Sequence, residues 1–238
     1  MPQLRNNLLT THFIYPLTAL VIVSIVIVVG DLDRRLADFF YAIQGNSWAV
    51  KNAWLAETFF HKGGRALSLL LALILLSLVI ASHFTRFLRP HQKPLLYLFL
   101  AAAGGSLLIS ALKSLLAVSC PWEFSRYGGD LLYTNVIDQL LLRNGDGCFP
   151  AGHASAGYAW VAAYFFGMHY QSPLRRFGLI LPLLVGFIFG LAQQLRGAHF
   201  LSHDLWALAI CWFYSLLLYL IFFKASAKTK IEEALVCL

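Results

Sequence analysis

The segment from Ala66 to Phe84 reads ALSLLLALILLSLVIASHF and contains no Asp, Glu, Lys or Arg. In the hydrocarbon of a bilayer a helix satisfies the hydrogen bonds of its own backbone, and about 20 apolar residues are enough to cross it. The whole chain has this character, since 59% of its 238 residues are apolar and 12% are charged. A soluble domain carries about 25% charged residues. The sequence therefore predicts a multi-span membrane protein.

Six windows of this kind occur along the chain. They run from about 13 to 30, 66 to 84, 95 to 118, 154 to 170, 177 to 195 and 205 to 223. We expect an all-α bundle of six transmembrane helices, forming a single membrane-embedded domain over residues 1–238. The first apolar run is longer than the core of a signal peptide and ends in Val-Val-Gly-Asp, so it is expected to be an uncleaved anchor.

The positions of the basic residues predict the orientation. Three short connections carry Lys or Arg without an acidic residue: Arg86, Arg89 and Lys93, then Arg175 and Arg176, then Lys224, Lys228 and Lys230. This positive-inside pattern places both termini in the cytoplasm. The other loops then face the periplasm, if the membrane is a bacterial inner (cytoplasmic) membrane. A net charge of +7 can also indicate nucleic-acid binding, but its distribution favours the lipid bilayer, and no nucleic-acid partner is expected.

Cysteine positions agree with this orientation. Cys120 and Cys148 fall in the same outer loop, whereas Cys211 lies inside the sixth span. Because such a loop faces an oxidising compartment, we expect a disulfide between Cys120 and Cys148. It would close a loop of about 29 residues, worth about 3–4 kcal/mol in the chain-entropy model. Two small buried thiols are the alternative.

The two outer segments at 31–65 and 119–152 are long. The first carries seven aromatic residues among polar ones: Phe39, Phe40, Tyr41, Trp48, Trp54, Phe59 and Phe60. This composition predicts one or two amphipathic helices in the membrane interface, with most of the aromatic side chains serving as ordinary interface anchors. Long irregular loops such as the second are often functional. In the fifth span, Gly186 and Gly190 predict close helix packing.

Polar and charged side chains mark the outer ends of two spans. Lys113 lies within the third span, about 1.5 turns from its end, where an ionisable group is costly; snorkelling to the interface is the alternative explanation. Gln193 and Arg196 end the fifth span. Residues three apart share a helix face, so these two side chains are expected to point at one spot.

Three histidines lie at the same outer plane. His153 opens the fourth span, and His199 and His203, followed by Asp204, lie between the fifth span and the sixth. Helix ends that offer cations and imidazoles at one depth make an anion pocket, for which phosphate is the natural ligand. Gly152 leaves the backbone uncovered where phosphate would approach, and the starts of two helices would add N–H groups.

Other chemistries fit these residues less well. Three histidines and an aspartate could bind a metal, but no H-E-x-x-H or H-x-x-E-H spacing occurs, and Lys113 and Arg196 would repel a cation. We therefore expect no metal and no cofactor. A Ser–His hydrolase built on Ser155 is disfavoured because this serine lacks the context of a nucleophile elbow.

These residues resemble the type 2 phosphatidic acid phosphatase superfamily, six-span membrane enzymes with the motifs K-x6-R-P, P-S-G-H and S-R-x5-H-x3-D. The stretch Lys113-SLLAVS-Cys120-Pro121 matches the first motif, with Cys in place of Arg. The stretch Pro150-Ala-Gly-His153 matches the second, with Ala in place of Ser. The resemblance covers the third to the sixth span, in motif order, spacing and topology.

The third motif is looser. Counting from His199 places Gln193 at the arginine position, where it is expected to contact the phosphate. The same count places His203 at the aspartate position, with Asp204 one residue late. By the resemblance, His199 attacks phosphorus to form a phosphohistidine, and His153 protonates the leaving oxygen. Asp204 is the expected orienting group for His199, with His203 as the second choice.

Both arginines that bind phosphate in the family are missing from these motifs. Arg196 lies one turn beyond Gln193, and Arg126 lies in the loop that the disulfide would hold near His153. We expect these two arginines to replace the missing pair and to bind phosphate together with Lys113.

The resemblance implies a metal-independent lipid phosphatase with its active site at the periplasmic face. Candidate substrates are undecaprenyl diphosphate, phosphatidylglycerophosphate, phosphatidic acid and a lipid A phosphate. A lipid phosphotransferase would use the same site with a second substrate in place of water. Loss of both arginines favours a third class, a catalytically inactive relative that binds a phosphorylated lipid, or a small transport protein.

Overall fold

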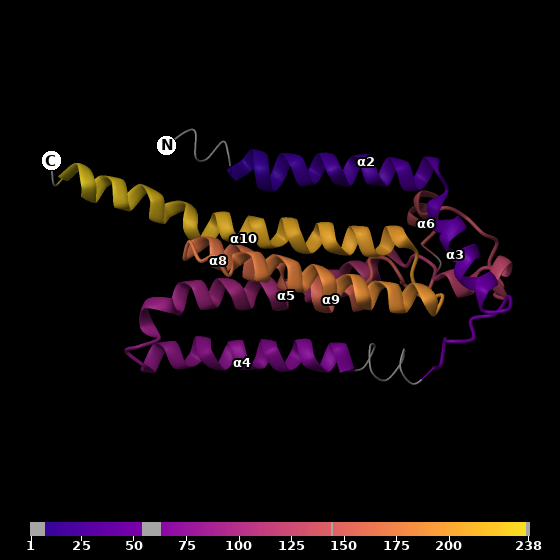
Figure 1. Ribbon diagram of the computed structural model, residues 1–238, viewed down its shortest axis with the longest axis horizontal. Helices are drawn as coiled ribbons and strands as arrows, with labels where there is room; N and C mark the ends of the chain where they lie inside the picture. The colour runs from indigo at the N-terminus through magenta and orange to yellow at the C-terminus, as the bar shows by residue number, and fades with distance from the viewer. Residues whose placement is uncertain (1–7, 54–62, 144, 237–238) are drawn as a thin grey trace.

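The structure, a computed structural model, describes residues 8–53, 63–143 and 145–236 (Figure 1). The long helices are α2 (Tyr15–Val29), α4 (Gly64–Phe84), α5 (Gln92–Leu116), α9 (Arg175–Leu195) and α10 (Leu201–Val236). The short helices are α3 (Leu32–Ile43), α6 (Val136–Leu142), α7 (Gly152–Tyr158) and α8 (Ala162–His169). Single turns of 3-10 or π-helix are η1 (Thr10–Ile14), η3 (Arg89–His91), η4 (Pro121–Glu123), η5 (Ser125–Tyr127) and η6 (Ala159–Val161). The predicted all-α class is confirmed within these residues.

Within the described residues, five helices are long and apolar enough to cross a membrane: η1 with α2, α4, α5, α9 and the part of α10 from Leu201 to Phe223. The chain thus has the helices of a multi-pass membrane protein. The predicted fourth span is divided into α7, the tight turn η6 and α8, and no piece reaches the length of a membrane-crossing helix by itself. The count of six spans is therefore not confirmed, although helical turns follow one another from 152 to 169.

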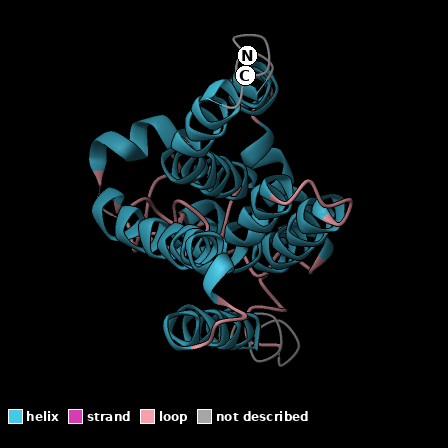
Figure 2. Cartoon of the chain, turned by 90° about the vertical axis from the view of Figure 1, so that its left-hand side faces the viewer, coloured by secondary structure: helices cyan, strands magenta, loops and turns pink. Residues whose placement is uncertain are grey.

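The helices run side by side along the long axis of the molecule. α10 packs against α5, and α7 and α8 pack against α9. α2 and α4 lie on opposite sides of this central group (Figures 1 and 2). Tyr97, Phe165 and Leu216 are fully buried between α5, α8 and α10, and the Tyr97 hydroxyl donates to the carbonyl of Ser215 at 3.2 Å. Burial of aromatic rings thus holds the central helices together.

Glycines let α7 approach α9 closely. A Cβ at Gly157 would clash with the backbone of Gly186, and a Cβ at Gly186 would clash with the ring of Tyr158. The predicted close packing at Gly186 and Gly190 is therefore confirmed. At Gly190 the neighbour is the carboxyl group of Asp204 on α10. This packing brings the start of α7, and with it His153, beside the end of α9 and the start of α10.

The two ends of the bundle differ in character. The start of α2, the connection from α4 to α5 and the start of α9 lie at one end (Figure 1). We call it the basic end, because it carries Arg86, Arg89 and Arg175. The opposite end, which we call the loop end, carries α3, α6 and residues 119–151 (Figure 1). The connections at this basic end carry no acidic residue, whereas the loop end mixes arginines with Asp31, Asp33 and Asp38. The predicted orientation rests on this distribution.

The first outer segment forms the amphipathic helix α3, which lies at the loop end, but several of its aromatic residues pack on protein. Phe40 is buried. The rings of Tyr41 and Trp48 pack on each other and on Tyr127. The expectation of interface anchoring is therefore wrong for Tyr41 and Trp48, because they pack on Tyr127 of the second outer loop, and for Phe40, which is buried. Phe39 is exposed. Trp54, Phe59 and Phe60 lie outside the described residues.

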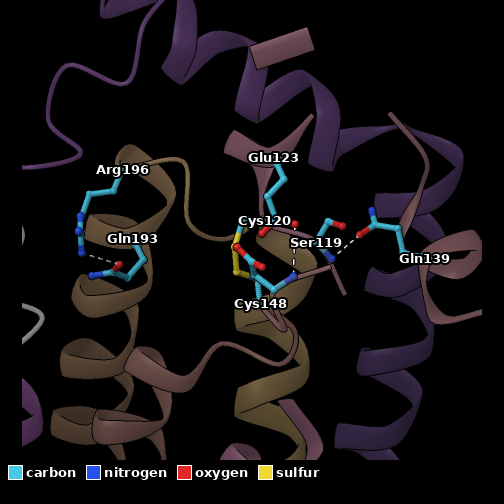
Figure 3. The surroundings of a disulfide bond; sticks show 8 residues. Ser119, Cys120, Glu123, Gln139, Cys148, Gln193 and Arg196 are labelled. Atoms are coloured by element: carbon cyan, nitrogen blue, oxygen red, sulfur yellow. Dashed lines mark hydrogen bonds between the residues drawn. A yellow bond between two sulfur atoms is a disulfide. The ribbon is translucent and has the colours of Figure 1, made fainter. Parts of the chain in front are cut away.

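The predicted disulfide between Cys120 and Cys148 is present, with the two Cα atoms 5.2 Å apart (Figure 3). Backbone hydrogen bonds reinforce it: the N–H of Cys148 donates to the carbonyl of Val118 at 2.6 Å. The N–H of Ser119 donates to the side-chain oxygen of Gln139 on α6 at 3.0 Å (Figure 3). The second outer loop is thereby attached at both of its ends to one place above α5 and α7.

Candidate active site

His153 and His199 meet at the loop end of the bundle. Their ring centroids are 6.0 Å apart, although the two residues are contributed by the start of α7 and by the turn between α9 and α10. A nucleophile and a proton donor each approach a reacting group to about 3–3.5 Å. The two rings are therefore close enough to act on the same group.

The turn that presents His199 is shaped by Gly197. This residue has a φ of +72°, and a Cβ on it would clash with the ring of Trp48. Its carbonyl accepts a hydrogen bond from the N–H of Trp122 at 3.1 Å. Since only glycine adopts this φ without strain, the chain reverses tightly here, and His199 is directed back over the helix ends.

His203 lies on the other side of His199, with 5.7 Å between the ring centroids. Its ring packs edge-on against Phe149 and Phe200. None of the four ring nitrogens of His199 and His203 has a hydrogen-bond partner among the described residues. The backbone carbonyl of Cys148 lies near the rings of both His199 and His203. It accepts no hydrogen bond of ordinary geometry from either ring. The buried nitrogens thus have unused hydrogen-bonding capacity, which a polar ligand would satisfy.

The surroundings of His199 favour its neutral form. Burial lowers the pKa of its imidazole well below the usual value, and the nearby His203, His153 and Lys113 lower it further. Burial disfavours the charged form of a group, and neighbouring positive charges act in the same direction. A neutral imidazole carries a lone pair, which is what a nucleophile requires.

Asp204 has a partner on α9 rather than on the histidines. One carboxylate oxygen accepts a hydrogen bond from the side chain of Gln194 at 2.5 Å, and the group packs against Gly190. No hydrogen bond joins it to His199 in this structure. The orienting contact expected for Asp204 is therefore not formed here, and the ring that lies beside His199 is that of His203, the residue at the formal position of the family aspartate.

Lys113 reaches the same site from the last turn of α5. Its side chain is half-buried and passes over the backbone of Gly147 and Gly152, where added Cβ atoms would lie 3.7 and 3.9 Å from it. The Lys113 side chain therefore packs along the backbone of these two glycines. The positive charge of Lys113 helps to lower the pKa of His199, as expected for a phosphate-binding cation.

Gln193 and Arg196 point together, as their spacing predicted. The Arg196 guanidinium donates to the side-chain oxygen of Gln193 at 3.1 Å (Figure 3) and to the backbone carbonyl of Lys51 at 2.7 Å. Both side chains are buried. Arg196 thus fixes the end of α9 to the segment after α3, and its predicted binding of phosphate, like that of Gln193, stays a prediction.

Arg126 contacts α3. Its guanidinium donates to both carboxylate oxygens of Asp38, at 2.6 and 2.7 Å, and Tyr127 donates to the same carboxylate at 3.0 Å. The hydrogen bonds that Arg126 donates to Asp38 raise the pKa of its guanidinium. Partial burial alone would raise the pKa of Asp38, but the bonds from Arg126 and Tyr127 hold it below the usual value. The structure thus joins Arg126 to α3, and its predicted binding of phosphate stays a prediction.

The start of α10 does not offer the free backbone donors that the sequence led us to expect. The N–H of Ser202 donates to the carboxylate of Asp33 on α3 at 2.8 Å. Burial raises the pKa of Asp33. Asp33 therefore occupies the place at this helix start where we had expected phosphate. No local pattern marks this role, because the two residues are far apart in sequence.

A cavity of about 510 Å³ opens beside His153, between α4, α5 and α7. Arg65, Lys113, Gly152 and His153 line one part of it. Most of the remaining wall is apolar and comes from α4 and α5, including Leu76. The site is therefore continuous with an apolar space inside the bundle.

Among the described residues, one group brings three potential metal-ligand atoms close together: Cys120, Glu123 and Cys148. The two sulfurs are bonded to each other, so they are not available as thiolate ligands. Asp204, which would complete a site with the histidines, is hydrogen-bonded to Gln194. The group of Cys120, Glu123 and Cys148 therefore does not provide a metal site.

Comparison with known proteins bears on the same part of the chain. Searches of curated proteins and of solved structures found no match. A family model described as the PAP2 superfamily matches residues 94–227, which is more than half of the chain. The matched range contains Lys113, His153, His199 and His203. With its apolar helices and its converging histidines, the chain belongs to the PAP2 superfamily, the type 2 phosphatidic acid phosphatases.

Proposed function

We propose that this protein is a membrane phosphatase that removes phosphate from a phosphorylated lipid through a phosphohistidine on His199. The observation that carries the proposal is the meeting of His153 and His199, with 6.0 Å between ring centroids, at the mouth of an apolar cavity. Membership of the PAP2 superfamily supports phosphatase activity on phosphate esters.

The proposed chemistry has two steps. A nitrogen of neutral His199 attacks phosphorus, the bond from phosphorus to the lipid oxygen breaks, and His153 gives a proton to that oxygen. Water then attacks the phosphohistidine, His153 takes a proton from this water, and the phosphorus–nitrogen bond breaks to release phosphate. Lys113 stabilises the negative charge on the phosphoryl oxygens in both steps.

The proposed orientation of the protein in the membrane rests on the distribution of its basic residues. With the basic end in the cytoplasm, the loop end and its histidines face the periplasm of a bacterial inner membrane. A lipid phosphate at that surface can place its headgroup between the histidines and its hydrocarbon in the cavity. Undecaprenyl diphosphate, phosphatidylglycerophosphate, phosphatidic acid and lipid A phosphates share this amphiphilic character.

The experiment that tests the function is a phosphate-release assay with the purified protein and a panel of these lipid phosphates. His199→Ala should abolish release. His91→Ala is the matched control, because His91 is exposed at the basic end and contacts Tyr170. Saturable binding without release by the wild type would identify an inactive lipid-phosphate-binding protein instead.

Two additions to the assay separate the remaining chemistries. Release that continues unchanged with a chelator supports the metal-free mechanism, whereas release that requires an added divalent cation contradicts it. A lipid alcohol or second lipid that acquires the phosphoryl group in place of water would identify a phosphotransferase.

A further inference from the structure

The cavity beside His153 has a polar end and an apolar end. α4 runs away from the loop end and α5 returns to it, so Arg65 and Lys113 lie at the same end of the cavity as Gly152 and His153. Toward the basic end the walls are lined by Leu73 and Leu76 of α4 and by Phe99 and Ala103 of α5. Such a space matches a molecule with one charged end and one hydrocarbon end.

The serine hydroxyl groups that line the cavity already form hydrogen bonds within the protein, so the part of the wall toward the basic end stays apolar. Ser155 donates to the carbonyl of Gly152 at 2.6 Å, and Ser110 donates to the carbonyl of Ser106 at 3.0 Å. Ser68 accepts from the indole N–H of Trp160 at 3.0 Å. With these groups satisfied, the side chains left to bind a charged headgroup are those at the loop end.

Two of the residues that line this cavity carry a full positive charge, Arg65 and Lys113. Arg65 is exposed, in the first turn of α4. It stands at the loop end, where α4 begins, and it lines the same cavity as His153. An arginine beside the histidines, at the polar end of an otherwise apolar cavity, is well placed to meet an anion.

The other candidate cations have protein partners. Arg126 is held by Asp38, and Arg196 is held by Gln193 and a backbone carbonyl. We propose that Arg65 is the second phosphate-binding cation of this site, holding with Lys113 the headgroup of a lipid phosphate whose hydrocarbon chain fills the cavity between α4 and α5. This inference rests on the proposed function, because it assumes that the histidines act on the same phosphate.

The dimensions define the substrate class. At about 1.5 Å per helical residue, the eleven steps from Arg65 to Leu76 span roughly 16 Å, and the fourteen steps from Phe99 to Lys113 span roughly 21 Å. The volume of about 510 Å³ lies within the range of single small-molecule pockets, roughly 300–1,000 Å³. The cavity therefore suits one extended hydrocarbon chain, and the inferred substrate is a phosphate carried on a long single chain.

The test compares hexadecyl phosphate, ethyl phosphate, inorganic phosphate and hexadecanol, using the full chain in detergent. Turnover of the two esters and ligand-induced thermal stabilisation by all four compounds are measured. Arg65→Ala should raise KM for hexadecyl phosphate about 10- to 100-fold, because a charged hydrogen-bonding partner is lost, and Arg65→Lys should restore part of the loss. Arg35→Ala is the matched control, an exposed arginine on α3 at the same end of the bundle.

A second variant tests the hydrocarbon part of the site. Ala103→Phe would fill the apolar part of the cavity, so it should raise KM for hexadecyl phosphate while leaving the kinetics of ethyl phosphate unchanged. Arg65→Ala should weaken the binding of both esters. Equal loss of both esters in Ala103→Phe would overturn the assignment of the cavity to the chain.

The results separate this inference from the proposed function. If the wild type turns over hexadecyl phosphate and Arg65→Ala behaves like Arg35→Ala, the function stands and the role of Arg65 is overturned. If no variant releases phosphate, but the wild type is stabilised by hexadecyl phosphate and Arg65→Ala is not, the binding role stands and the catalytic function falls. Stabilisation by hexadecanol equal to that by hexadecyl phosphate would show that the cavity binds the hydrocarbon chain without recognising the phosphate.

Discussion

At the scale of single residues, the site depends on groups whose hydrogen-bonding capacity is left open. His199 and His203 are almost fully buried, and their ring nitrogens lack hydrogen-bond partners among the described residues. Unsatisfied buried polar groups destabilise a fold by about 1–3 kcal/mol each. They persist where function requires them, and in the proposed mechanism His199 uses this capacity in contact with the phosphoryl group.

The lowered pKa of His199 predicts how stability depends on pH. Below about pH 6.5 an unfolded chain protonates this imidazole while the folded protein keeps it neutral. The unfolded state then binds more protons, so stability falls as the pH falls below 6.5. His199→Asn removes this contribution, which is on the order of 1 kcal/mol at pH 5.5.

Thermal unfolding at pH 7.5 and pH 5.5 checks this expectation. The wild type should lose about 2–4 °C more in Tm on acidification than His199→Asn does, the change that about 1 kcal/mol gives in a protein of this size. Identical losses in the two proteins would show that His199 is protonated in the folded state.

The choice of orienting group for His199 is also a residue-scale question. Asp204→Asn keeps an oxygen that can accept the hydrogen bond from Gln194, so kcat should change little. His203→Gln removes the ring beside His199, and kcat should fall by about tenfold or more, an increase in barrier of about 1.4 kcal/mol. The pH profile of kcat should shift in the His203 variant alone, a readout that a purely structural role would not move. A large loss in Asp204→Asn with none in His203→Gln would restore Asp204 to that role.

At the scale of elements, the broken helix formed by α7, η6 and α8 is positioned by contact with its neighbours. Glycines on α7 and α9 face each other, and close approach of helix backbones in membranes depends on such small residues. This contact holds His153 beside the turn that carries His199. The position of His153 relative to His199 therefore depends on how closely α7 packs against α9.

Substitution at this contact should show the dependence. Gly186→Ala would place a methyl group against the ring of Tyr158 and should lower stability by about 1–3 kcal/mol, the usual effect of overpacking. Gly105→Ala is the matched control, because its nearest neighbour would be the Cβ of Ala159 at 3.5 Å, an ordinary contact. Thermal unfolding of the two variants measures the difference, and equal Tm values would mean that α7 and α9 separate without loss.

At the scale of the whole molecule, the loop end is a cover assembled from distant segments. α3 is joined to the second outer loop through Asp38 and Arg126 and to α10 through Asp33. The Cys120–Cys148 disulfide fixes the same loop above α5 and α7. Together these contacts hold the residues that precede His153 in place.

Removing the disulfide should therefore affect both stability and turnover. Replacement of Cys120 and Cys148 by alanine should lower the free energy of unfolding by about 3–4 kcal/mol, the value for a loop of about 29 residues. Turnover should fall as well, because Cys148 leads directly into the segment that carries His153. Dithiothreitol should lower the Tm of the wild type and leave that of the double variant unchanged; a wild type insensitive to reduction would contradict this account.

Much of the element-level plan could be predicted from the sequence. Long uncharged runs such as 66–84 specify membrane-length helices, because burial of an uninterrupted apolar surface in lipid is a local property of the segment. The positions of Cys120 and Cys148 specified the disulfide. The division of the fourth span at η6 was not foreseen, since hydropathy is continuous across it.

The partners of charged groups were decided by the tertiary structure alone. Sequence placed Arg126 and Arg196 near phosphate because they lie close to the motifs along the chain. Folding joined Arg126 to Asp38 and brought Arg65 to the cavity that His153 lines. An ion pair or a cavity wall depends on where distant segments meet, whereas helix formation in a membrane depends on the residues of one segment, so the sequence determined the helices and only the packed structure determined which cations face the site.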